Sequence, residues 1–416
     1  MAVHDVDIVV MGAGLQGAGI ALELARRGTA VTLLDQDAHP MNRASLRNEG
    51  KIHLGLIYAA SRDTAFLQLD GALRFRSSIA RWLPAAEGIA VSTPFHYLVA
   101  RDSLMTPDAL AEHYAAIEAR CRELLDADKS LDYMGTRPAT LFRRLEPQEI
   151  AAHFDPDRFI GGFATAELAV DTDRLADAIR RAIASSPLVT FLPSHRVRTL
   201  KQKGDVFVVG GNSPAGAWQI EARQVVNATW ERRLALDHQL GFEPPKDLLH
   251  RLKYRVLARV PDDLRHAPSV SMVLGRYGDV VVRPDGLAYL SWYPAGLRGW
   301  SHDIEPPADW DGPCRGETAK DMALEVERSI REGIADWYRG FARCQVVQVD
   351  AGAIVAIGRS DVDDAASGLH DRTRIGVRSR GGYHSADPGK LTTAPWFAVQ
   401  VADRVQAFRY VQGLLA

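Results

Sequence analysis

The chain has 416 residues, of which 46% are hydrophobic and 25% charged, so a globular protein of two domains is expected. Its formal net charge of -2 argues against a nucleic-acid partner, because such proteins carry a basic surface. No apolar run reaches the roughly 18 residues of a spanning helix and no signal-peptide pattern opens the chain, which predicts a cytoplasmic protein without a transmembrane segment and leaves membrane contact open.

The first predicted unit is a strand, a glycine-rich turn and a helix. Gly12, Gly14 and Gly17 have the spacing G-x-G-x-x-G and directly follow the apolar run 8–11. In dinucleotide-binding folds the first glycine allows a tight turn, the second lets a pyrophosphate approach the backbone, and the third lets the helix pack closely. The N-terminal amides of such a helix favour a negatively charged ligand. We therefore expect a dinucleotide at this turn.

A second strand, 30–34, follows the helix and ends at Asp35. An acid at this position accepts hydrogen bonds from unphosphorylated ribose hydroxyls, which favours FAD or NAD over NADP. Residues 42–53 then form a polar, glycine-punctuated stretch before the apolar residues 54–58, and this stretch is unlike a second Rossmann crossover. Because the chain has only one G-x-G-x-x-G, a second site for a nicotinamide is unsupported. FAD is therefore favoured over NAD, and the electrons are expected to come from the substrate.

The middle of the chain predicts a second sheet and several amphipathic helices. Strand-like patterns occur at 95–100, 159–164, 189–192, 197–200, 206–209, 251–260 and 280–292. Helical patterns occur at 107–126, 170–181 and 318–341. Residues 224–230 read as an apolar strand that ends in small and polar residues, as parallel strands often do beside a ligand. An ordinary buried strand and loop explains this last stretch equally well.

The cysteines and histidines predict neither a disulfide nor a metal site. Cys121, Cys314 and Cys344 are far apart and form no C-x-x-C, so free structural thiols are expected. The histidines have no H-x-x-x-H or mixed Cys/His spacing, which gives no reason to expect a metal. The chain also lacks the G-D-A-x-H segment of hydroxylases that use NADPH.

Four stretches, 12–35, 45–58, 225–230 and 381–403, resemble the FAD-dependent D-amino-acid-oxidase superfamily. Asn48, Gly50, Ile52, His53, Gly55 and Tyr58 fit the block N-S-G-x-I-H-x-G-x-Y-Y of 2-hydroxyglutarate dehydrogenases. Residues 389–393 match the G-K-x-T-T of flavin glycerol-3-phosphate dehydrogenases, and 357–364 and 369–372 resemble two further segments of that group. The chain departs from the pattern at Ser360, where that group has proline, and at 45–51, where SLRNEGK replaces S-S-K-S-x-K.

The resemblance implies an α/β fold in which a Rossmann-like FAD-binding domain is interleaved with an α+β substrate domain built on an antiparallel β-sheet. The expected division assigns 1–60, 146–230 and 342–416 to the FAD domain, and 61–145 and 231–341 to the substrate domain. A helix beginning after Gly389 would point its N-terminal amides at the flavin. No cysteine lies in the flavin-lining stretches, so non-covalent FAD is expected.

The resemblance and the motifs together assign candidate site residues. Those expected to bind FAD are Gly12, Gly14, Leu15, Gln16, Gly17, Asp35, Gln36, Ser45, Asn48, Lys51, His53, Val197, Ala228, Thr229, Trp230, Gly389, Lys390, Leu391 and Thr392. The catalytic candidates are His53, Arg359, Tyr383 and His384.

Each catalytic candidate has a competing interpretation. His53 could contact the flavin or act as the base for a hydroxyl proton, or it could only support its loop. Tyr383 and His384 are the competing base or orienting pair. Arg359 suits a carboxylate or phosphate, unless it pairs with Asp361 or Asp363 at the surface. Arg255 and Arg283 could then bind the anion instead, and Lys390 is expected to hold flavin or substrate charge.

The resulting prediction is a FAD-dependent dehydrogenase or oxidase that takes a hydride from a CH–OH carbon. Its substrate would be a small anion, such as a 2-hydroxy acid or a polyol phosphate, and its electron acceptor oxygen or a quinone. The first alternative is oxidation of a CH–NH carbon of an amino acid or amine. The second is a non-catalytic flavoprotein in which FAD is structural and the pocket binds a partner.

Overall fold

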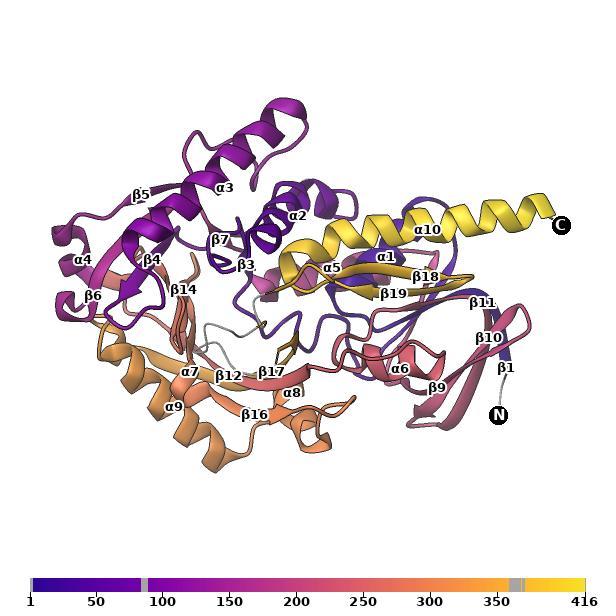
Figure 1. Ribbon diagram of the computed structural model, residues 1–416. Coiled ribbons are helices and arrows are strands. Elements are labelled where there is room, and N and C mark those ends of the chain that lie inside the picture. The colour runs from indigo at the N-terminus through magenta and orange to yellow at the C-terminus, as the bar shows by residue number, and fades with distance from the viewer. Residues whose placement is uncertain (1–2, 84–88, 359–367, 369–370, 416) are drawn as a thin grey trace.

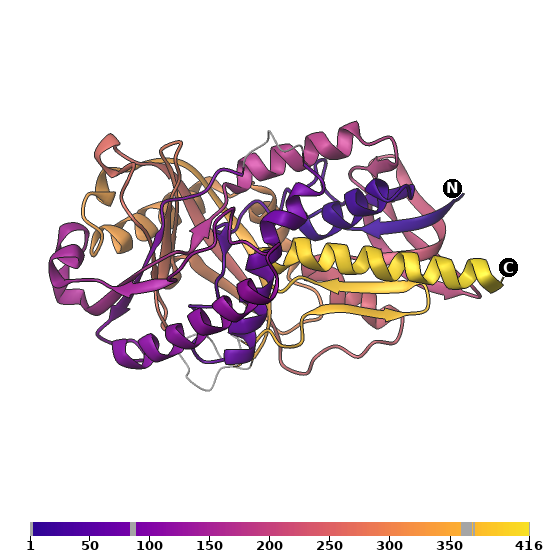
Figure 2. The ribbon, with the colours of Figure 1, turned by 90° about the horizontal axis from the view of Figure 1, so that it is seen from above.

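The computed structural model describes residues 3–83, 89–358, 368 and 371–415. Two large sheets form the two halves of the molecule, called here the first sheet and the second sheet (Figure 1). The two chain termini lie at the same end, on the side of the first sheet (Figure 2). Segments from both ends of the chain therefore build one half.

The first sheet has the parallel centre that the sequence predicts. β1 (Val3–Met11) lies between β2 (Val31–Leu34) and β11 (Gly216–Asn227) and pairs in parallel with both. Residues 8–11 are buried, as expected of a strand that is covered on both faces. The order is β18-β19-β11-β1-β2-β8, and β10 and β9 extend the sheet from β11 as antiparallel strands. The remaining strands are β8 (Val189–Leu192), β9 (Arg196–Lys203), β10 (Val206–Ser213), β18 (Gly376–Arg380) and β19 (Tyr383–Asp387).

Helices pack on this sheet and on one another. They are α1 (Leu15–Arg26), α2 (Arg62–Ala80), α5 (Thr172–Ser185) and α10 (Ala394–Leu415). α10 lies along α1 and α2 (Figure 1). Glu23 of α1 is wholly buried and accepts hydrogen bonds from Arg26, Arg27, Arg81 and Trp82. Although burial alone would raise the pKa of Glu23, these hydrogen bonds hold the pKa well below its ordinary value.

The second sheet is mostly antiparallel and has the order β16-β12-β15-β14-β13-β4-β6-β5, with β17 also paired to β12. Among the described strands of this sheet, only β13 and β4 pair in parallel. Its strands are β4 (Phe95–Ala100), β5 (Phe142–Arg144), β6 (Phe159–Thr165), β12 (Leu248–Arg259), β13 (Ser269–Met272), β14 (Gly278–Val282), β15 (Leu287–Trp292), β16 (Leu297–Ser301) and β17 (Gln345–Ile357). The mixed α/β architecture with a second, largely antiparallel sheet is confirmed.

Two helices in the second half test the sequence patterns. α3 (Pro107–Ala127) begins after Thr106, whose side chain accepts from the amide of Ala109, as the pattern predicts. The helix predicted for 318–341 is shorter, because α9 (Lys320–Ala335) ends before Trp337. Gly340 then turns the chain with φ +88°, a conformation that a helix cannot contain.

The segments that join the two halves do not follow the expected division of the chain. β6 and β17 belong to the second sheet, although 146–230 and 342–416 were expected in the FAD domain. The remaining short strands and α-helices are β3 (Lys51–Ile52), β7 (Leu168–Ala169), α4 (Pro147–His153), α6 (Arg233–Gln239), α7 (Tyr293–Gly296) and α8 (Asp311–Arg315). The three cysteines are free and buried, as predicted. Within the part of the chain that the structure describes, no helix has the length and apolar character needed to cross a membrane.

Candidate active site

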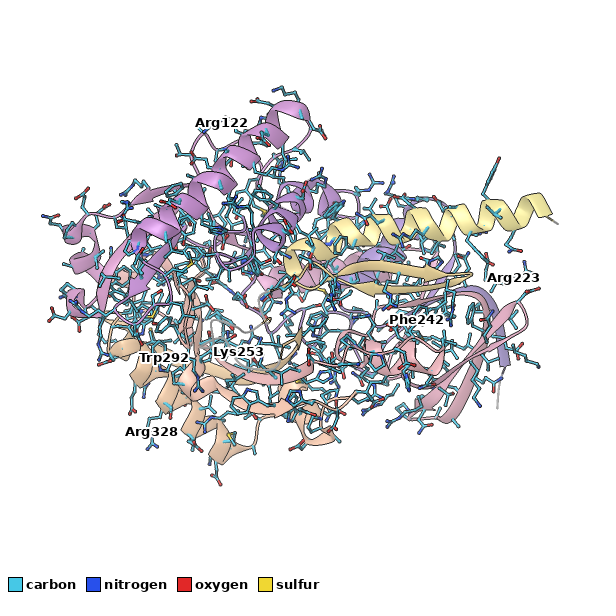
Figure 3. All side chains as sticks on the ribbon, viewed as in Figure 1. Arg122, Arg223, Phe242, Lys253, Trp292 and Arg328 are labelled. Carbon is cyan, nitrogen blue, oxygen red and sulfur yellow. The ribbon has the colours of Figure 1, made fainter. Side chains whose placement is uncertain are left out.

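A cavity of about 290 Å³ is lined by residues of both halves. It contains most residues predicted to bind FAD: Gly12, Gly14, Leu15, Gln16, Asp35, Gln36, Ser45, Asn48, Lys51, His53, Val197, Ala228, Thr229, Trp230, Gly389, Lys390 and Leu391. Gly17 and Thr392 do not line it and instead support residues that do. Lys253 lies in the interior of the molecule, whereas Arg122, Arg223 and Arg328 lie at its periphery (Figure 3).

The glycine turn has the close contacts that its motif requires. Gly12 has φ +93°, and a Cβ there would meet the Ala228 carbonyl oxygen at 2.6 Å. A Cβ on Gly17 would lie 1.8 Å from the carbonyl oxygen of Gly12, so this glycine lets α1 pack against the turn. A Cβ on Gly14 would meet Ser45 Oγ at 2.9 Å, and Ser45 Oγ accepts from the amide of Leu15 at 2.9 Å. The space beside Gly14, called here the cradle, is therefore open because Gly14 has no side chain.

Asp35 is positioned at the end of β2 by two backbone amides. Its carboxylate accepts from Ala13 N at 2.6 Å and from Asp37 N at 2.8 Å. Burial raises the pKa of Asp35 to about 6, although both hydrogen bonds act in the opposite direction. Next to it, Gln36 Oε1 is buried without a hydrogen-bond partner among the described residues. A carboxylate and an orphaned amide oxygen that line the cavity suit the hydroxyls and amino group of a nucleotide.

The end of β11 forms the opposite side of the glycine turn. Ala228 donates its amide to the Met11 carbonyl at 2.9 Å, which places Ala228 and Thr229 against Gly12. Trp230 has φ +51° and donates its indole N–H to the Ala353 carbonyl of β17 at 2.9 Å. The strand that the sequence left ambiguous therefore ends beside the cavity, as the ligand-binding interpretation predicts.

His53 lies at the junction of the two halves. Its amide donates to Thr392 Oγ1 at 3.0 Å, and Thr392 Oγ1 donates in turn to the Lys51 carbonyl at 3.2 Å. Burial lowers the pKa of His53, so its imidazole is neutral near pH 7. Thr392 belongs to a 3₁₀ turn (Leu391–Thr393) that precedes α10, so the chain enters α10 through this turn instead of starting the helix directly after Gly389.

Charged groups of both signs line the cavity near His53. The ammonium of Lys390 makes no hydrogen bond or ion pair with any described residue, and burial lowers its pKa to about 8. Arg372 is buried, donates one N–H to the Val355 carbonyl at 3.1 Å, and leaves Nε without a partner among the described residues. Lys253 lies 3.8 Å from Asp279 and stacks over the ring of Tyr293. These three cations can bind an anion inside the cavity.

Glu49 is the acidic counterpart of this group. Burial would raise its pKa, but Lys390 and Lys253 lower the pKa to about 2, so the carboxylate is ionised. Its Oε1 lies 3.8 Å from His53 Nε2. A carboxylate with so low a pKa is a poor base, which leaves the neutral imidazole as the better proton acceptor here.

Tyr383 and His384 do not reach the cavity, so their expected role as base or orienting pair is not met. Tyr383 donates its hydroxyl to Asp237 at 2.6 Å and accepts from Asn227 at 2.8 Å. His384 is bonded to Ser379 and Gln224 within the first sheet, and burial lowers its pKa to about 4. Both side chains stabilise the strands that carry the cavity wall. Arg359 lies outside the described residues.

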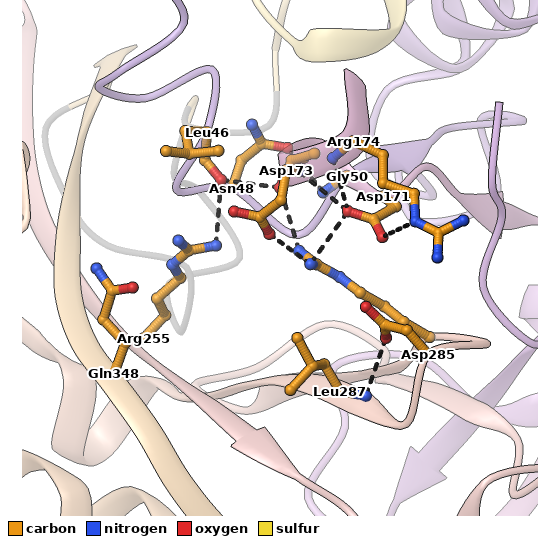
Figure 4. A network of polar contacts seen from close by, with 12 residues as sticks. Leu46, Asn48, Gly50, Asp171, Asp173, Arg174, Arg255, Asp285, Leu287 and Gln348 are labelled. Atoms are coloured by element: carbon orange, nitrogen blue, oxygen red, sulfur yellow. Dashed lines mark hydrogen bonds and ion pairs between the residues drawn. The ribbon is translucent and has the colours of Figure 1, made fainter. Parts of the chain in front are cut away.

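The two arginines named as substitutes for Arg359 are already paired. Arg255 donates to both oxygens of Asp350, at 2.6 and 3.2 Å, and to the Leu46 carbonyl at 3.1 Å. Arg283 donates to Asp171 at 3.2 Å and to Asp173 at 2.5 Å. Figure 4 labels these two acids and shows the bond from Arg255 to Leu46. Neither guanidinium lines the cavity, so the expectation that they bind the substrate anion is wrong. They join the loop at 46–50, the start of α5 and the second sheet.

Four residues near His53 were not singled out from the sequence: Glu49, Glu167, Lys253 and Arg372. Glu49 had a signal, because it replaces the serine of the N-S-G-x-I-H block. Lys253 had no distinctive signal, because its strand also carries Arg251 and Arg255. Glu167 and Arg372 are far from His53 in the sequence, and only the folded chain brings them to it.

Residues 7–404 match the family described as FAD dependent oxidoreductase, DAO. The chain belongs to this family. It is a FAD-dependent enzyme, and the open cradle at Gly14, the carboxylate of Asp35 and the orphaned Gln36 oxygen fit that cofactor.

An 80-residue stretch, 19% of this chain, is 42% identical to the tRNA 5-methylaminomethyl-2-thiouridine biosynthesis bifunctional protein MnmC of Chromohalobacter salexigens, and it spans 11% of that protein. The fold is similar to glycine oxidase from Geobacillus kaustophilus, with TM-score 0.69, 15% identity and coverage of 97% and 95% of the two chains. It is also similar to L-α-glycerophosphate oxidase from Mycoplasma pneumoniae with FAD bound, with TM-score 0.64, 16% identity and coverage of 97% and 95%. These similarities show the fold and leave the substrate class open.

Proposed function

We propose that the enzyme oxidises the CH–OH carbon of a small anionic substrate, a 2-hydroxy acid or a polyol phosphate. The observation that carries this proposal is the neutral, buried His53 beside the unpaired ammonium of Lys390 in one cavity. An alcohol must lose a proton as its C–H bond breaks, and a neutral imidazole is suited to take that proton. An amine that is already uncharged needs no such base.

The cations of the cavity would hold the anionic end of the substrate. Lys390 has no competing ion pair among the described residues, and Arg372 keeps an unsatisfied buried N–H. A bound carboxylate or phosphate would satisfy both, which lowers the cost of leaving these groups buried. When bound, FAD supplies the acceptor for a hydride. The reacting carbon would then be held between the anion site and His53.

Oxidation of a CH–NH carbon is the second candidate. Glu49 favours it, because an ionised carboxylate without a hydrogen-bond partner among the described residues could hold a substrate ammonium. The similarity to glycine oxidase supports the same candidate. We keep it second because Glu49 faces His53, and a protonated amine there would have to lose its proton before oxidation.

Anaerobic bleaching of the flavin tests the proposal. The holoenzyme is mixed with a panel of 2-hydroxy acids, polyol phosphates and amino acids while the flavin absorbance is followed. We expect bleaching by a hydroxy acid or polyol phosphate, and much slower bleaching in His53→Gln with the same substrate. Bleaching by amino acids alone, with His53→Gln as fast as wild type, would transfer the assignment to CH–NH oxidation. Reoxidation by air or by a soluble quinone then identifies the electron acceptor, which we propose is one of these two.

A further inference from the structure

Glu167 is a buried carboxylate behind His53, in the turn between β6 and β7. Its Oε2 accepts from the amide of Leu54 at 2.7 Å, and its Oε1 accepts from the hydroxyl of Tyr97 at 2.5 Å. The backbone at 53–54 is thus bonded on one side to Glu167 and on the other to Thr392. Two hydrogen-bond donors hold this wholly buried carboxylate in place, so its oxygens stay close to the imidazole.

The imidazole of His53 lies between two carboxylates. Nδ1 is 3.6 Å from Glu167 Oε1, and Nε2 is 3.8 Å from Glu49, which lines the cavity. Nδ1 is buried without a hydrogen-bond partner among the described residues. A ring shift of about half an ångström brings Nδ1 within hydrogen-bonding distance of Oε1. Glu167 is therefore the acceptor to which an Nδ1 proton can be donated.

We propose that Glu167 is a positioning residue that holds the proton of His53 on Nδ1 and so makes the cavity-facing Nε2 the base. This inference rests on the proposed function. In the reaction Nε2 would take the substrate hydroxyl proton and the O–H electrons would form the carbonyl, while bound FAD would supply the acceptor for the hydride lost from carbon. The imidazolium that results is stabilised by the adjacent Glu167 carboxylate.

The surroundings of the ring decide its charge before the reaction. Glu167 and Glu49 face its two nitrogens, Lys51 and Lys390 lie within electrostatic range, and Tyr58 packs against its edge. Burial and the two lysines lower the pKa of His53, whereas Glu167 raises it. Without Glu167 the imidazole would be a still weaker base, and Glu49, the carboxylate that remains beside the ring, would favour a proton on Nε2 instead.

The tautomer can be measured without turnover. Holoenzyme labelled with ¹⁵N-histidine is studied by two-bond ¹H–¹⁵N NMR, and His53 is assigned from the signal missing in His53→Gln. We expect the neutral ring to carry its proton on Nδ1, and its pKa to fall by about one unit in Glu167→Gln. Tyr97→Phe is the matched control, because it removes a hydrogen bond to the same carboxylate and keeps the charge. A proton on Nε2 in the wild type, or an unchanged pKa in Glu167→Gln, would overturn the inference.

Kinetics separates positioning from a merely structural role. With a substrate found by bleaching, kcat/KM should fall as the pH drops through the pKa of His53, and Glu167→Gln should move this limb about one pH unit lower. A structural role would lower the plateau without moving the limb, and would overturn the inference. If Glu167→Gln does not fold, Glu167→Asp keeps the charge and should keep the limb in place. Full turnover of His53→Gln would defeat the proposed function, whereas the NMR result still decides whether Glu167 sets the tautomer.

Discussion

The buried charges around Glu23 and those around Lys390 are arranged in opposite ways. Glu23 is surrounded by donors from α1 and from the end of α2, and each of its oxygens accepts hydrogen bonds. Lys390 has no partner among the described residues, and Arg372 and Glu49 beside it are only partly satisfied. A satisfied cluster stabilises the fold, whereas an unsatisfied one in a cavity is stabilised by what binds there. The Glu23 cluster is therefore suited to stabilise the fold, and the Lys390 cluster is suited to bind a ligand.

The largest effect is expected at the glycine turn, which serves both the packing of α1 and the binding of FAD. In Gly17→Val the side chain would overlap the Gly12 carbonyl, since even a Cβ would lie 1.8 Å from its oxygen. We expect loss of folded, yellow protein, measured by flavin absorbance and circular dichroism after purification. Gly28→Ala is the matched control, because Gly28 has φ +80° and a Cβ there would meet no other described residue within 4 Å, so the variant should cost only about 1 to 2 kcal/mol. Equal FAD retention in both variants would contradict the role of Gly17.

The next effect tests the satisfied cluster. Glu23→Gln removes the buried negative charge and turns an amide N–H group toward the partly exposed guanidinium donors, so unfolding should become easier by about 2 to 4 kcal/mol. Because the folded pKa of Glu23 lies below its unfolded value, the stability it contributes is present above about pH 4.5 and is lost as the pH falls further. Urea unfolding at pH 7 and at acidic pH measures both points. The difference between wild type and variant should shrink at the acidic pH, and a constant difference would mean that the charge is not responsible.

The sequence predicts the nucleotide-binding unit well and the roles of isolated polar residues poorly, for a physical reason. Gly12, Asp35 and the strand before them form one local unit whose geometry follows from spacing, and the cavity does contain them. Tyr383, Arg255 and Arg283 are polar residues whose partners come from distant segments, so their sequence neighbourhood does not reveal that they are already paired. The two-sheet architecture is predictable from strand patterns, whereas the membership of β6 and β17 depends on pairing that only the folded chain defines.

The third effect tests the unsatisfied cluster. Lys390→Met should lower kcat/KM for an anionic substrate by about 10- to 150-fold, which corresponds to about 1.5 to 3 kcal/mol for a charged hydrogen bond. In the wild type, kcat/KM should fall above pH 8, because the free ammonium has a pKa of about 8 and loses its charge there. Lys129→Met, which removes an exposed lysine, is the control and should leave the kinetics unchanged. A basic limb that persists in Lys390→Met would assign it to another group.

The smallest effect concerns Asp35 and returns to the nucleotide. Burial raises its pKa to about 6 in the free protein, and ribose hydroxyls are bound by the ionised form, so FAD binding must expel a proton when the pH is below 6. The dissociation constant for FAD should therefore rise about fivefold between pH 6 and pH 5, or about 1 kcal/mol, and change little between pH 7 and pH 8. Fluorescence titration of the apoprotein with FAD measures this dependence, and Asp35→Asn should bind more weakly but with no break near pH 6. If the wild type binds FAD equally at pH 5 and pH 7, Asp35 serves only to hold the Ala13 amide.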